Sequence, residues 1–167
     1  MIKQTEPRNG YITQHFACYG YDLLYISEAH QGIDFDFDRV NSIYKAGINS
    51  NLIGYMIGEM FYSGENHNPL DGWFVEDATG LLALSGCQNT KILMGPLDAG
   101  MWPIDTEIPE RTGIIQKWHN DRTGFSHYVV GNPDGTVQWD PIERSPGVGS
   151  RTVAEGRLVS LRLIQFV

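Results

Sequence analysis

Three residues of this chain, Cys18, His127 and Asp140, are of the types that thiol nucleophilic chemistry needs. A cysteine becomes a strong nucleophile when it ionises, and a neighbouring imidazole can take up the thiol proton and return it later. A carboxylate beyond the imidazole fixes its tautomer and stabilises its charged form. The residue types therefore indicate a Cys/His/Asp triad if the fold brings them together.

The sequence around Cys18 predicts an element that favours its thiolate. The stretch 18–30 contains no proline, is followed by Gly32, and spaces its apolar residues along one side of a helix. We expect the helix to start at or just after Cys18. The partial positive charge of a helix N-terminus stabilises a thiolate.

The other two residues flank a predicted β-hairpin. The segments SHYVVG and TVQWD are joined by NPDG, a proline and glycine turn signal. His127 lies at the start of the first strand and Asp140 at the end of the second, so an antiparallel pairing brings them near each other. If the hairpin packs against the helix, the three residues meet at one cleft.

The remaining elements predict an α+β protein formed by residues 1–167 as a single domain. A second helix is expected from an N-cap at Asp38 to Gly47, and a third over 52–61, where apolar residues recur at helical spacing. The second half is rich in β-branched and aromatic residues between turn signals. The predicted strands are GWFVED, KILMG, GIIQKWH, SHYVVGN, TVQWD and GRLVSLRLIQFV.

These motifs resemble those of papain-like cysteine peptidases related to the double-glycine leader peptidases of bacteriocin exporters. The likeness lies in TQHFACYG before a helix, then SHYVV, a turn and WDP. The resemblance implies a papain-like fold, with N-terminal helices packed on a C-terminal antiparallel sheet. It also implies a catalytic Cys18, His127 and Asp140, with Gln14 as an oxyanion donor. The stretch SRTVAEGRLVSLRLIQF resembles the end of small prophage proteins that we associate with the same fold.

Several positions depart from that family pattern and keep a second function open. Gln14 lies four residues before Cys18, where five or six are usual, while Tyr19 and Ser126 stand where the family commonly has glycine. The first reading is a thiol hydrolase, most simply a cysteine peptidase acting on a peptide or isopeptide bond. The alternative is a catalytically degenerate binding protein of prophage origin that holds a host protein or peptide in its cleft. A cell-wall amidase is a third possibility.

Other candidate sites in the sequence are less complete. Cys87 has no matching helix start or histidine motif and is interpreted as structural. His15 and Cys18 form H-x-x-C, yet no second pair has the spacing of zinc ligands. Asp34, Asp36 and Asp38 alternate with phenylalanines, but a calcium loop needs more oxygen ligands and a glycine at the bend. We therefore expect no metal and no organic cofactor.

The charge and hydropathy of the chain limit its partners. A formal charge of −8 disfavours contact with nucleic acid or anionic lipid in the absence of a basic patch, which the sequence lacks. No stretch is long and apolar enough for a membrane span or a signal peptide, and two cysteines make no disulfide framework. We expect a cytoplasmic protein that acts on a peptide or protein. The role of the loop 63–72 and the oligomeric state are left open.

Overall fold

A computed structural model describes residues 17–57, 59–63, 73–98, 107–142 and 156–167. The described residues form an α+β fold, as predicted, with three helices and two antiparallel sheets. The helices are α1 (Cys18–Gln31), α2 (Phe37–Asn49) and α3 (Ala78–Leu84). The strands are β1 (Ile53–Ile57), β2 (Met60–Tyr62), β3 (Phe74–Val75), β4 (Thr90–Asp98), β5 (Thr112–His119), β6 (Ser126–Gly131), β7 (Val137–Trp139) and β8 (Arg157–Phe166).

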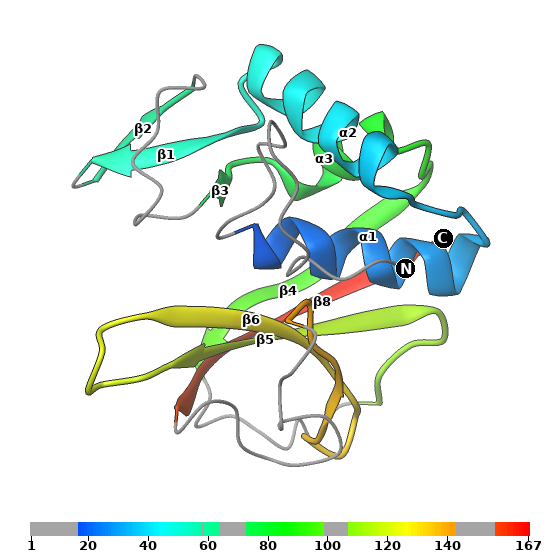
Figure 1. Cartoon of the computed structure of the whole chain (residues 1–167). Helices are drawn as coiled ribbons and strands as arrows, with labels where there is room; N and C mark the ends of the chain where they lie inside the picture. The colour runs from blue at the N-terminus through cyan, green and yellow to red at the C-terminus, as the bar shows by residue number, and fades with distance from the viewer. Residues whose placement is uncertain (1–16, 58, 64–72, 99–106, 143–155) are drawn as a thin grey trace.

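The five-stranded sheet, in the order β4-β8-β5-β6-β7, forms one side of the molecule. Helix α1 crosses one face of this sheet, and α2, α3 and the three-stranded sheet β2-β1-β3 lie on the other side of α1 (Figure 1). The largest core cluster joins α1 to residues of both sheets and of the other two helices. Helix α1 is therefore packed on both sides, which fixes the position of its first turn.

The prediction for the first helix is confirmed, and that for the second is confirmed with shifted ends. Helix α2 starts one residue before Asp38, because Asp36 is the N-cap and its carboxylate accepts from the Arg39 amide at 2.8 Å. Gly47 does not end the helix. It lies inside α2 against Ile53, where an added Cβ would come within 2.8 Å of the isoleucine side chain.

The predicted third helix over 52–61 is wrong, because β1 and β2 form an antiparallel hairpin there. The apolar residues that suggested helical spacing are shared between two strands, and Gly54 allows the backbone of Tyr62 to approach closely. Helix α3 was missed. It starts at Ala78, after the N-cap Asp77, whose carboxylate accepts from the amide of Gly80 at 2.9 Å.

The strands of the second half were predicted well. The hairpin β6-β7 is confirmed, with Val130 opposite Trp139 and a turn closed by the bond from the Asn132 amide to the Thr136 carbonyl at 2.8 Å. Gly135 adopts a positive φ of 86°, a backbone conformation that suits glycine. Among the described residues, no helix is long and apolar enough to cross a membrane.

Candidate active site

Cys18 is the first residue of α1 and is half-buried. The residue before it, Ala17, has no polar side chain, so it supplies no side-chain cap to the first amides of the helix. No acidic residue occupies the first turn of α1. The N-terminal amides of α1 thus keep their partial positive charge for an anion at the Cys18 sulfur.

Tyr44 of α2 holds the start of α1 in place. Its hydroxyl donates to the carbonyl of Ala17 at 2.8 Å, and the side chain is fully buried. The ring reaches this position because residue 20 is glycine, since an added Cβ would overlap the Tyr44 hydroxyl. Gly20 weakens the helix by about 1 kcal/mol relative to alanine, and in return α2 approaches the turn that carries Cys18.

His127 and Asp140 form the other part of the site. The Nε2 of His127 donates to Oδ1 of Asp140 at 2.8 Å, and the exposed fractions of the two side chains are 18% and 1%. The same Oδ1 accepts from the amide of Ile142 at 2.8 Å. Asp140 therefore both caps a local turn and orients the imidazole.

His127 also interacts with Cys18. Burial by itself lowers the pKa of His127, but hydrogen bonds to Asp140 and Cys18 and the negative charges of both groups outweigh burial and raise that pKa from 6.5 to about 10. Because Nε2 is bonded to Asp140, Nδ1 is the ring nitrogen left for the Cys18 thiol. The raised pKa keeps His127 protonated at neutral pH, as an imidazolium beside the Cys18 sulfur.

Two contacts behind the site fix the hairpin that carries His127 and Asp140. The buried Gln116 of β5 donates from Nε2 to the carbonyl of Gly135 in the hairpin turn at 3.1 Å. On the other face, Trp139 stacks on Tyr25 of α1 with ring centroids 4.4 Å apart. Trp139 is thus a packing residue, and the hairpin is joined both to the sheet and to α1.

The remaining residues singled out from the sequence lie elsewhere. Gln14 and His15 fall outside the described residues, as does most of the loop 63–72. Cys87 is buried in the core and accepts a hydrogen bond from Ser85 at 3.3 Å. No group of three or more His, Cys, Asp or Glu side chains in the described part of the chain is placed to hold a metal ion.

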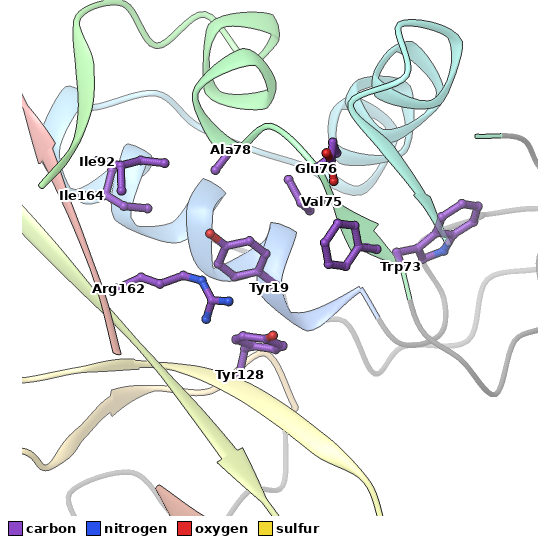
Figure 2. A pocket seen from close by; sticks show the side chains of 10 residues that line it. Tyr19, Trp73, Val75, Glu76, Ala78, Ile92, Tyr128, Arg162 and Ile164 are labelled. Carbon is purple, nitrogen blue, oxygen red and sulfur yellow. The ribbon is translucent and has the colours of Figure 1, made fainter. Parts of the chain in front are cut away.

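A cavity of about 190 Å³ lies beside the first turn of α1, and sequence reasoning missed it. Tyr19 of α1, Tyr128 of β6 and Arg162 of β8 form one wall (Figure 2). Val75, Ala78 and Ile164 contribute apolar surface. The family pattern has a glycine where Tyr19 stands, but no local pattern relates Tyr19 to a strand more than one hundred residues away.

Comparisons of the chain with protein-family models, curated proteins and solved structures gave no match. The function is therefore inferred from the geometry of the chain itself.

Proposed function

We propose that the protein is a thiol hydrolase with a papain-like arrangement, most simply a cysteine peptidase acting on a peptide or isopeptide bond. The observation that carries this proposal is the convergence of Cys18, His127 and Asp140 from a helix start and the two ends of a hairpin. Nucleophilic acyl transfer by a thiol requires an imidazole hydrogen-bonded to the thiol and a carboxylate that orients the imidazole.

In the first half of the reaction, the Cys18 thiolate attacks the carbonyl carbon of the bound substrate and forms a tetrahedral adduct. The oxyanion lies at the start of α1, where backbone amides can stabilise it. Collapse of the adduct breaks the carbon–nitrogen bond, and the His127 imidazolium gives its proton to the leaving amine. The product of this half is a thioester on Cys18 and a neutral His127.

In the second half, His127 takes a proton from water as the water attacks the thioester. The carboxylic product leaves, the Cys18 sulfur departs as thiolate, and His127 is again the imidazolium. Asp140 stays ionised throughout, because its role is to hold the ring and stabilise the positive charge. No step requires a metal or an organic cofactor.

The test is the rate of iodoacetamide modification between pH 5 and 9, with mass mapping to separate Cys18 from the buried Cys87. In the wild type, we expect fast labelling of Cys18 at pH 6, well below the ordinary thiol pKa of about 8.5. His127→Ala should slow this labelling, and Cys18→Ser should abolish it at that site. Slow labelling of Cys18 that is independent of His127 contradicts the proposal and favours a binding protein that retains the scaffold.

A further inference from the structure

Arg162 of β8 carries a guanidinium that is enclosed by aromatic rings. Its Cζ lies 5.0 Å from the ring centroid of Tyr19 and 5.2 Å from that of Tyr128, and Figure 2 shows the group between the two rings. The aromatic rings attract the positive charge but provide no lone-pair acceptor for its N–H groups. They leave its N–H bonds, which point outward in the plane, to find acceptors of their own.

One edge of this guanidinium has no acceptor. Within the described part of the chain, Nη1 of Arg162 is buried and makes no hydrogen bond, and no ion pair joins Arg162 to a described carboxylate. Tyr19 does not neutralise it, because burial raises the pKa of this phenol to about 12 despite the opposing effect of Arg162. A buried charged donor without a partner is costly, and an anionic ligand would remove that cost.

The cavity that Arg162 lines suits a single side chain. Its volume of about 190 Å³ is below the roughly 300–1,000 Å³ of sites for drug-sized ligands. Val75, Ala78 and Ile164 supply apolar walls, as a hydrocarbon stem beneath a charged head would need. Glu76 also lines the cavity, but it is exposed, so solvent screens its charge.

The cavity is lined by the residues that directly follow two of the candidate reacting groups. Tyr19 directly follows Cys18 in α1, and Tyr128 directly follows His127 in β6. Because consecutive Cα atoms are about 3.8 Å apart, a side chain bound between the tyrosines belongs to a residue close to the carbonyl that Cys18 attacks. The cavity is thus placed to select a substrate rather than to bind an unrelated molecule.

We propose that this cavity is a specificity subsite for the carboxylate of a glutamate or aspartate near the scissile bond, with Arg162 as its recognition residue. The proposal rests on the function proposed above, since it takes Cys18 as the nucleophile. A carboxylate, with one negative charge, matches the single guanidinium, whereas a phosphate brings nearly two. Arg162 presents the planar pair of donors that a carboxylate accepts.

The first experiment measures binding without chemistry. N-acetyl-glutamate N-methylamide and its glutamine counterpart are titrated into the Cys18→Ser variant and followed by backbone amide NMR shifts. The two compounds have nearly the same shape, so any difference in affinity reports the charge. We expect the glutamate compound to bind about tenfold to hundredfold more tightly, the range for a hydrogen bond to a charged group.

The recognition residue is tested in the same assay with two variants made in the Cys18→Ser background. Arg162→Gln should abolish the preference for glutamate, and Arg162→Lys should retain part of it, because lysine keeps the charge but loses the planar fork. Equal affinities for the two compounds in Cys18→Ser alone overturn the proposal, whether or not the Arg162 variants fold. A glutamate preference that survives in Arg162→Gln overturns it as well.

The second experiment links the subsite to Cys18. Acetyl-dipeptide chloromethyl ketones with glutamate or glutamine at either position are reacted with the wild type, and Cys18 labelling is quantified by mass mapping. We expect faster labelling by a glutamate compound, with the difference lost in Arg162→Gln. If glutamate binds selectively but Cys18 does not react with any of these compounds, the subsite stands and the proposed peptidase function fails. If the glutamine compounds label Cys18 as fast, the subsite proposal fails and the peptidase function stands.

Discussion

Replacing Asp140 with asparagine tests how much the charge of the carboxylate contributes to the activated pair. The amide oxygen of asparagine can still accept from Nε2 of His127, which lies 2.8 Å from Oδ1 in the wild type. The substitution therefore keeps the acceptor and removes the negative charge from a position that is only 1% exposed. Loss of that charge should lower the pKa of His127 and shift the proton from the imidazolium back to the Cys18 thiolate.

The size of the effect follows from the strength of the bond. A hydrogen bond to a charged group contributes about 1.5–3 kcal/mol, compared with about 1 kcal/mol for a neutral one. Exchanging the charged acceptor for a neutral one therefore costs on the order of 1.4 kcal/mol, which corresponds to a factor of ten. The ratio of the thiolate–imidazolium pair to the neutral pair should fall by about this factor. Only the thiolate reacts, so the rate of Cys18 alkylation at pH 6 should fall with the fraction of Cys18 that is thiolate, by up to about tenfold.

The assay is the second-order rate constant for iodoacetamide at pH 6 in the wild type, Asp140→Asn and Asp121→Asn. Asp121 is the matched control, because it also loses one negative charge but lies 66% exposed in an ion pair with Arg157. The control rate should stay within about twofold of the wild type, since exposed charges are screened. An Asp140→Asn rate equal to that of the control refutes the reasoning that Asp140 stabilises the imidazolium.

Three further predictions concern stability. The pKa of His127 is raised in the folded state from 6.5 to about 10. The stabilising contribution of its protonated form is therefore full below pH 6.5 and is lost as pH rises toward 10. Thermal unfolding measured from pH 6 to 10 should show a steeper fall in melting temperature for the wild type than for His127→Gln. Gly20→Ala should lower the free energy of unfolding by about 1–3 kcal/mol through overlap with the Tyr44 hydroxyl, measured by urea denaturation, and an unchanged value contradicts the close approach. Gln116→Leu should cost about 1–3 kcal/mol by leaving the Gly135 carbonyl without this buried donor, whereas a stability equal to the wild type shows that the bond is dispensable.

The elements that carry the candidate triad could be predicted because each has a local signal. A proline-free stretch ended by Gly32 predicts α1, and the capping glycine has a φ of 69° in the structure. The turn residues NPDG predict the β6-β7 hairpin, and the pairing of its strands then follows from antiparallel geometry. Local patterns with strict backbone requirements transfer reliably from sequence to structure.

The β1-β2 hairpin could not be predicted in the same way. Over 52–61 the apolar residues fit helical spacing as well as two short strands, because both strands carry large apolar side chains on exposed as well as less exposed positions. Ile57 and Met60 are 60% and 63% exposed. A short apolar run of this kind fits the periodicity of a helix and that of a strand equally well. The pairing of β1 with β3 is what makes this segment a strand.

The cavity was beyond sequence reasoning for a different reason. Arg162 lies in a strand of mixed polar and apolar residues, where an arginine is normally a solvated side chain with its stem on the sheet. Its proximity to Tyr19 comes from the order β4-β8-β5-β6-β7, in which β8 is inserted between two strands that precede it in the chain. Sheet order depends on long-range contacts, and no local pattern encodes it.

The candidate chemistry and the candidate recognition are carried by neighbouring residues on the same two elements. On α1, Cys18 and Tyr19 differ by one residue, which turns their side chains about 100° apart around the helix. On β6, His127 and Tyr128 are likewise consecutive. A shift of α1 relative to the sheet would therefore move Cys18 away from His127 and, at the same time, Tyr19 away from Tyr128 and Arg162. The anchoring of α1 by Tyr44 and of the hairpin by Gln116 should consequently affect reactivity and glutamate preference in parallel, whereas a change at Arg162 should affect the preference alone.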